Sequence, residues 1–211
     1  MCAYLWQQSA GLQHAAPTML RATVIASRSV ARSLSSSPAV ADFAACSVVQ
    51  HAAGLRLVAT RDVATDEAIF RFSGVLIRSN TGDRCLRVGE RHYLTPAAEE
   101  GEPPWVFLNH SFEPTVRLSH PPLPSGTADP PPTVLTATAN LDLPAGTPLT
   151  FDYNLHEYVM FGDGFVCEET GRVVRGFHHL SPEEKEALLP RAMPFVRTLH
   201  GQHLFGSESR C

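Results

Sequence analysis

The sequence predicts a mostly β domain that is made of short strands and ends in one or two C-terminal helices. Short apolar or alternating stretches recur between clusters of Gly, Pro, Asn and Asp, which is typical of strands joined by turns. No long helical pattern alternates with them, which argues against a doubly wound α/β fold. The helix signals lie after residue 180.

The strand predictions rest on alternation and on turn residues. Apolar and polar residues alternate over 54–63, as in a half-buried strand, and threonines alternate with apolar residues over 134–141. Gly89 and Glu90 lie near the turn of a predicted hairpin. Strands are predicted over residues 54–63, 68–72, 75–77, 85–88, 91–94, 116–118, 134–141 and 149–153.

Residues 120–132 are dense in proline, and proline cannot donate a hydrogen bond to a sheet. We therefore expect a surface loop there. A proline-rich partner motif is the functional alternative, although the segment lacks a flanking basic residue.

The C-terminal part carries the helix signals. Ser181 and Glu184 have the spacing of a capping box, and Pro182 suits the first helical position. The pattern predicts a short helix over 183–189, which Pro190 ends. A second helix is predicted over 193–200.

Composition limits the class of protein. The chain has 211 residues, 44% of them hydrophobic and 18% charged, which suits one globular domain with a tail. It contains no apolar run of about 18 residues, so no membrane span is predicted. The net charge of −4 argues against nucleic-acid binding. We also expect a monomer. The five cysteines form no C-x-x-C pair, so neither a disulfide framework nor a cysteine-built zinc site is indicated.

Residues 1–41 differ from the rest. They contain arginine, many Ser and Ala residues, and no Asp, Glu or Lys. This composition is typical of a transit peptide, which predicts a location in an organelle (mitochondrion or chloroplast). The alternative is a disordered extension without a targeting role, in a protein of the cytoplasm or nucleus.

Two short strings carry the functional argument: Phe107–Ser111, which reads FLNHS, and Leu149–Asn154, which reads LTFDYN. Each alone would also suit an ordinary strand or turn. In their order and spacing they resemble the two signature segments of the SET-domain protein-lysine methyltransferases. The resemblance implies a β-clip-like SET fold in which the first segment passes under the last strand as a pseudoknot. It covers a SET-like domain over 45–160 and a post-SET-like segment with C-terminal helices over 161–211.

The resemblance also implies roles for individual residues. Tyr153 matches the catalytic tyrosine, and Asn109 and His110 match the pair that contacts the cofactor, S-adenosylmethionine. Phe151 matches a channel position where Phe leaves room for di- or trimethylated product. Gly54 matches the first glycine of the family's Gly-x-Gly cofactor strand, which places Leu55 and Arg56 at the cofactor as well. Tyr93 lies on a strand like that of the family's substrate-channel tyrosine.

Methyl transfer suits such a set of residues. The target lysine must lose its proton, and free lysine has a pKa of about 10.4. An apolar channel and a nearby sulfonium both disfavour the ammonium form. A tyrosine hydroxyl can orient the amine, and much of the rate then comes from alignment. The reaction needs neither a nucleophilic side chain nor a metal.

The sequence departs from the family at two places. Arg56 stands where the second glycine is expected, so its side chain would either crowd the cofactor or reach its carboxylate. Phe112 replaces the first zinc-binding cysteine, and of the later ones only Cys167 remains, so four thiolate ligands cannot be assembled. We infer a zinc-free tail in which Phe112, Phe165 and Phe177 pack where the metal would have been. Zinc at one equivalent per chain would refute this inference.

Other chemistries are less well supported. His156–Glu157 and His178–His179 could suggest a metal site, but no third ligand has a recognisable spacing. Neither a Gly-x-Ser-x-Gly elbow nor a phosphate-binding glycine loop is present. The sequence therefore predicts a methyltransferase that acts on a protein or peptide lysine. The alternative is a catalytically inactive SET-like module that binds a protein or peptide.

Overall fold

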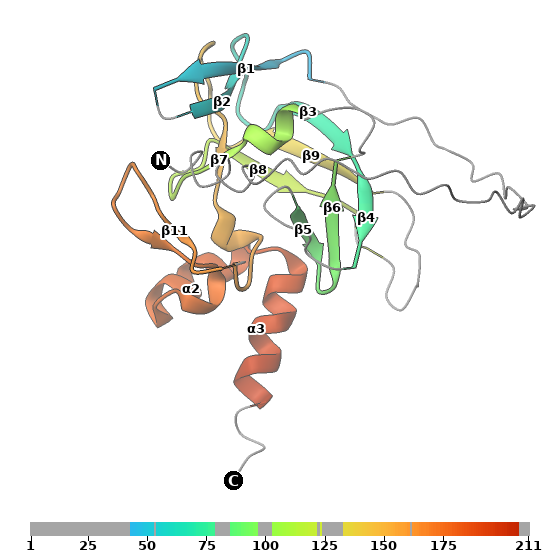
Figure 1. Ribbon diagram of the computed structural model, residues 1–211, viewed down its shortest axis with the longest axis vertical. Coiled ribbons are helices and arrows are strands. Elements are labelled where there is room, and N and C mark those ends of the chain that lie inside the picture. Colours follow the sequence, from blue (N-terminus) through green and yellow to red (C-terminus); the bar gives the residue numbers. More distant parts are fainter. Residues whose placement is uncertain are drawn as a thin grey trace, which may run out of the picture.

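The computed structural model describes residues 43–52, 54–78, 85–96, 103–121, 123, 133–160 and 162–206 (Figure 1). The predicted transit peptide, most of the proline-dense loop and the residues after 206 lie outside the described residues. Where the chain is described, no helix is long and apolar enough to cross a membrane.

The described strands are short and form small sheets, as the sequence predicts. Their bounds are β1 Cys46–His51, β2 Gly54–Ala59, β3 Ala68–Ser73, β4 Val75–Ile77, β5 Leu86–Gly89, β6 His92–Thr95, β7 Asn109–His110, β8 Val116–Ser119, β9 Val134–Ala139, β10 Thr150–Phe151, β11 Phe165–Val166 and β12 Val173–Val174. The sheets pair in the orders β1-β2, β3-β9-β8, β4-β6-β5, β10-β7 and β11-β12.

Both predicted C-terminal helices are present. Their bounds are α2 Pro182–Leu188 and α3 Pro194–Gly206. The capping box at the start of α2 is formed in both directions by Ser181 and Glu184, with Pro182 in the first turn. Short 3₁₀ turns are η2 Pro104–Phe107, η3 Tyr153–Leu155, η4 Phe177–His179 and η5 Leu189–Arg191. A mostly β fold that ends in two helices is thus confirmed, and it is consistent with a SET-like fold.

Strands β7 and β10 form the feature that positions the site. They pair in parallel, with Asn109 opposite Thr150 and His110 opposite Phe151. The backbone N–H of Ser111 extends the pairing by donating to the carbonyl of Phe151 at 3.2 Å. All other strand pairs among the described residues are antiparallel. The two signature segments therefore lie side by side, as the predicted pseudoknot requires.

Two turns that are far apart in the sequence, at residues 62–65 and 142–145, bond to each other. The carboxylate of Asp62 accepts the N–H of Ala145 at 2.9 Å, and the carboxylate of Asp142 accepts the N–H of Thr65 at 2.8 Å. Val63 and Leu143 form a bridge between the same two turns. These hydrogen bonds and the bridge hold the two turns together.

The core has two parts. The larger part lies among β1 to β10 and includes the fully buried Leu57, Phe72 and Leu135. The smaller part lies under α3 and includes the fully buried Phe177 and Val196. Figure 1 shows that β1 and β2 lie at one end of the molecule and that α3 extends from the other end.

Candidate active site

Tyr153 lies where the two signature segments meet. Its hydroxyl donates to the carbonyl of Leu108 at 2.8 Å, and its backbone N–H donates to Nδ1 of His110 at 3.2 Å. The sequence predicted that a strand would carry Tyr153. Instead the strand ends at Phe151, and Tyr153 begins the turn η3, where Asp152 is the N-cap. Because the backbone turns here, the Tyr153 side chain no longer follows the alternation of the strand and points toward Leu108.

A third segment is attached through Asn109. Its side-chain Nδ2 donates to the carbonyl of Leu55 at 3.3 Å. The neighbouring Gly54 has φ +119°, a conformation that residues with a Cβ rarely adopt. The structure thus brings the predicted cofactor residues of β2 and β7 together beside Tyr153.

Arg56 lies on the same strand, opposite Val49, and is half-buried. The fully buried Leu57 faces the core, so Arg56 projects from the other face of β2.

His110 is buried and neutral. Its Nδ1 accepts the N–H of Tyr153, so its proton is on Nε2. Burial lowers its pKa to about 4, and the positive charge of Arg172 acts in the same direction. The ring is surrounded edge-on by Phe112, Tyr153 and Phe165, at centroid distances of 4.6, 5.3 and 5.8 Å.

The Nε2 atom of His110 bears on whether a cofactor could bind here. It is buried and has no hydrogen-bond partner among the described residues. A buried donor without a partner costs about 1–3 kcal/mol, which a ligand with an acceptor atom would recover. S-adenosylmethionine carries several acceptors, so the residues of this region fit it.

Asp152 and Asn154 hold the turn that carries Tyr153. The carboxylate of Asp152 accepts both the backbone N–H and the side-chain amide of Asn154, each at 2.9 Å. The amide oxygen of Asn154 in turn accepts the N–H of Gly176 at 3.2 Å. Burial raises the pKa of Asp152 to about 6. Sequence reasoning assigned these two residues no role, although Asp before a short turn is a typical N-cap signal.

Phe151 and Tyr93 were predicted along the lysine channel. The buried Phe151 ring contacts Tyr153 at 4.6 Å and His156 at 5.2 Å between centroids. Tyr93, in β6, lies under the guanidinium of Arg87 at 5.7 Å, and that guanidinium also lies over Phe195 of α3 at 5.6 Å. Phe151 is therefore beside Tyr153, whereas the channel role of Tyr93 stays a prediction.

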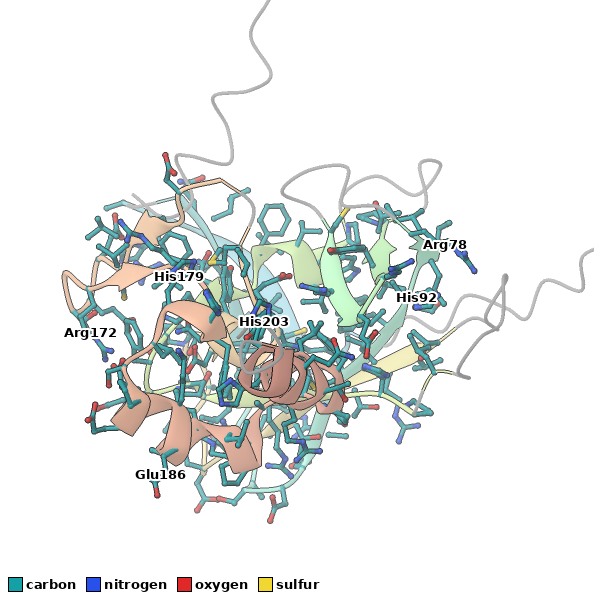
Figure 2. All side chains as sticks on the ribbon, turned by 90° about the horizontal axis from the view of Figure 1, so that it is seen from below. Arg78, His92, Arg172, His179, Glu186 and His203 are labelled. Atoms are coloured by element: carbon teal, nitrogen blue, oxygen red, sulfur yellow. The ribbon has the colours of Figure 1, made fainter. Side chains whose placement is uncertain are left out.

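The tail is held to the site by polar and aromatic contacts. Ser111 Oγ donates to Glu169 at 2.9 Å, which ties β7 to the β11–β12 loop. The guanidinium of Arg172 lies 3.9 Å from the centre of the Phe112 ring and pairs with Glu184 of α2. Figure 2 shows Arg172 on the opposite side of the molecule from His92.

The packing predicted for the three tail phenylalanines is only partly observed. Phe112 and Phe165 both contact His110, but Phe177 belongs to the smaller core, where it stacks on Tyr158 at 6.5 Å. In the part of the chain that the structure describes, no group of three His, Cys, Asp or Glu side chains is arranged to hold a metal ion. The ring of His178 lies 5.0 Å from that of His179 and 5.2 Å from that of His203 in α3.

Comparison with known proteins gives little. No family model matches the sequence, and no curated protein compared with it matches either. Among solved structures, a proposed histone methyltransferase of Plasmodium falciparum is similar at 16% sequence identity and a TM-score of 0.39. The similarity covers 51% of this chain and 96% of that one.

Proposed function

We propose that the chain is an S-adenosylmethionine-dependent methyltransferase that acts on a lysine side chain of a protein. The observation that supports this most is the meeting of three segments at Tyr153. Its hydroxyl is fixed by Leu108, its backbone by His110, and Asn109 joins the same segment to Leu55. These are the positions at which the resemblance expects the catalytic tyrosine and the cofactor contacts.

Each of the residues at this site would have its own role. Gly54, Leu55, Asn109 and His110 would hold the cofactor, which supplies an activated methyl group for transfer to the amine nitrogen. Tyr153 would orient the amine through its hydroxyl, which the contact with Leu108 already holds in place. The apolar ring of Phe151 would exclude water and disfavour the charged ammonium, so that a lone pair is available. Fixed alignment of this kind supplies much of the rate.

The test measures cofactor binding by calorimetry. S-adenosylmethionine should bind the full chain, and Asn109→Ala should weaken binding at least about tenfold, because a side chain that orders the cofactor strand is lost. Asn140→Ala is the matched control. The side-chain amide of Asn140 donates a hydrogen bond to the carbonyl of Pro114, which follows Asn109 in the same stretch of chain. Loss of this bond should leave the cofactor affinity unchanged.

A catalytically inactive SET-like module that binds a protein or peptide is the second candidate. The half-buried Arg56 favours it, because an arginine stands where the resemblance expects a glycine beside the cofactor. No detectable binding at millimolar cofactor would support this candidate over the enzyme. Recovery of binding by Arg56→Gly would identify the arginine as the cause.

A further inference from the structure

Tyr153 is enclosed by a small hydrogen-bonded ring. The Oδ1 atom of Asp152, the residue before it, accepts the backbone N–H of Asn154, the residue after it, at 2.9 Å. The same oxygen accepts the side-chain amide of Asn154, also at 2.9 Å. A ring of this kind, in which an Asp side chain bonds to the backbone two residues on, restricts the backbone dihedrals of the residue between. Asp152 therefore sets the direction in which the Tyr153 side chain leaves the chain.

The ring is bonded to its surroundings at two points. The backbone N–H of Tyr153 donates to Nδ1 of His110 in β7 at 3.2 Å. The amide oxygen of Asn154 accepts the N–H of Gly176, before η4, at 3.2 Å. Asp152 is 3% exposed and Asn154 is 1% exposed, so water competes little for these bonds. The geometry of the ring is therefore passed on to Tyr153 rather than lost to solvent.

Both bonds that close the ring end on one ionisable oxygen. Hydrogen bonds to an ionised carboxylate are about twice as strong as bonds to a neutral acceptor. Burial raises the pKa of Asp152 to about 6, although its bonds from Asn154 and the charges of Arg191 and Arg172 act in the opposite direction. The Nδ1 atom of His110 lies 3.8 Å from the carboxylate, and burial keeps this ring neutral above about pH 4. The ring around Tyr153 thus gains its charge as the pH rises through about 6.

We propose that Asp152 is a positioning residue for methyl transfer, and that its carboxylate holds Tyr153 so that the hydroxyl stays directed at the target amine. Tyr153 touches the reacting atoms, and Asp152 acts through it. Protonation of Asp152 weakens both bonds of the ring and leaves Tyr153 less well aligned. Because alignment supplies much of the rate, transfer is faster when Asp152 is ionised. This inference rests on the proposed function.

The test compares wild type with Asp152→Asn, which keeps the shape and an acceptor oxygen but carries no charge. Initial rates of labelled-methyl transfer from S-adenosylmethionine into the same fractionated cell extract are measured between pH 5 and pH 8.5. The ratio of the two rates cancels effects common to both proteins, such as deprotonation of the target lysine. It also cancels the titration of Glu157, which faces Arg87 and whose pKa burial raises to about 7.

The ratio should depend on pH with a definite sign. Above about pH 7 the wild type has an ionised Asp152 and should be about tenfold faster than Asp152→Asn. As the pH falls through about 6, the wild-type carboxyl takes up a proton, so the ratio should approach one. All rates are measured well below the melting temperature of each protein, so that a loss of folded chain does not enter the ratio.

Asp142→Asn is the matched control. One oxygen of Asp142 likewise accepts two bonds from a single residue, the backbone N–H of Thr65 at 2.8 Å and its hydroxyl at 2.9 Å. This carboxylate is exposed and belongs to a turn at residues 142–145. Asp142→Asn should therefore transfer methyl groups at the wild-type rate at every pH.

Hydrogen exchange of the wild type provides a second measurement that does not depend on the folding of Asp152→Asn. The Asn154 amide should lose about tenfold of its protection between pH 7 and pH 5, whereas the Leu149 amide, which donates to the carbonyl of Leu57, should keep its protection. Unchanged protection of Asn154, or an active wild type whose ratio to Asp152→Asn does not vary with pH, would overturn the role of Asp152 and leave the proposed function intact. Wild type that transfers no methyl group would overturn both.

Discussion

The hydroxyl of Tyr153 donates a hydrogen bond to the carbonyl of Leu108, and removal of this hydroxyl is the most direct probe of the site. Tyr153→Phe should lower methyl transfer at least about 100-fold, the usual cost of losing one preorganised polar group at a reacting centre. Cofactor affinity and melting temperature should stay close to those of the wild type. Labelled-methyl transfer and calorimetry measure the two effects separately.

Tyr158→Phe is the matched control for that substitution. It removes the same atom from a tyrosine whose hydroxyl lies 3.3 Å from His178 in the smaller core, away from the site. Its turnover should equal that of the wild type. A wild-type rate in Tyr153→Phe would remove the catalytic role assigned to Tyr153.

The burial of His156 predicts that the stability of the chain depends on pH. Its pKa falls from 6.5 to about 3 in the folded chain, so the folded state keeps the ring neutral. The stabilisation is present above pH 6.5 and is lost as the pH falls toward 3, because the unfolded chain takes up a proton that the folded chain refuses. Relative to His156→Leu, the wild type should lose about 1.4 kcal/mol of unfolding free energy per pH unit between about pH 6 and about pH 4.

Denaturant titrations at several pH values measure this difference. A difference between wild type and His156→Leu that does not change with pH would mean that His156 is hydrated in the folded chain.

At this scale the sequence predicted which residues meet but not how they are oriented. The two strings correctly placed Asn109, His110, Phe151 and Tyr153 in one region. The contributions of Asp152, Asn154 and His156 were missed, because they depend on a single 3₁₀ turn. A turn of three residues has no periodicity that a sequence pattern could reveal.

The β11–β12 segment is attached to the site by side chains, and Arg172 makes two of these contacts. It lies over Phe112 and pairs with Glu184. Arg172→Ala should loosen the segment, which backbone hydrogen exchange over residues 165–174 would report as a loss of protection of about tenfold. Arg172→Lys should recover only part of it, because an ammonium lacks the flat face that stacks on the ring.

Arg175→Ala is the control, since Arg175 is an exposed arginine next to the same strand. If both substitutions changed hydrogen exchange equally, net charge rather than the stacking of Arg172 would hold the segment. Metal chelation should leave the exchange of residues 165–174 unchanged, in keeping with the inference of a zinc-free tail.

The helices were easier to predict than the strands. The capping box and Pro182 fixed the start of α2 to within one residue, because these signals are local. The strand predicted over 149–153 was too long, since alternation continues through Asp152 while the backbone has already entered a turn. Strand ends depend on a partner far away in the sequence, which a local pattern does not contain.

Gly176 lies against the backbone of Glu157 and Tyr158, next to the smaller part of the core. It has φ +97°, and a Cβ added there would lie 2.9 Å from the carbonyl oxygens of Glu157 and Tyr158. Gly176→Ala should therefore destabilise the whole chain by about 3 kcal/mol or more, from the backbone conformation and the clash together. Chemical denaturation with two probes, tyrosine fluorescence and circular dichroism, would show whether both parts of the core unfold together.

Gly171 offers the matched control. It also has a positive φ, of +69°, but an added Cβ would meet nothing within 4 Å. Gly171→Ala should cost about 1 kcal/mol, from the backbone conformation alone. Equal costs at the two positions would mean that the backbone at Gly176 moves to make room for the added Cβ.

The overall class of the molecule could be predicted, but its sheet order could not. Short strands and C-terminal helices followed from composition and turn residues. In the order β3-β9-β8, strand β3 pairs with β9, which is far away in the chain, and nothing in a strand pattern identifies such a partner. The signature strings supplied the one long-range pairing that was predicted, between β7 and β10.

That parallel pairing has a consequence for how the molecule folds and varies. Residues 109 and 150 must find each other across the intervening chain, so the site forms only after a large loop has closed, which is a slow step. The entropy of closing a loop grows only with the logarithm of its length, about 0.6 kcal/mol for each doubling. A change in the number of residues between β8 and β9 should therefore alter the free energy of closing this loop only slightly.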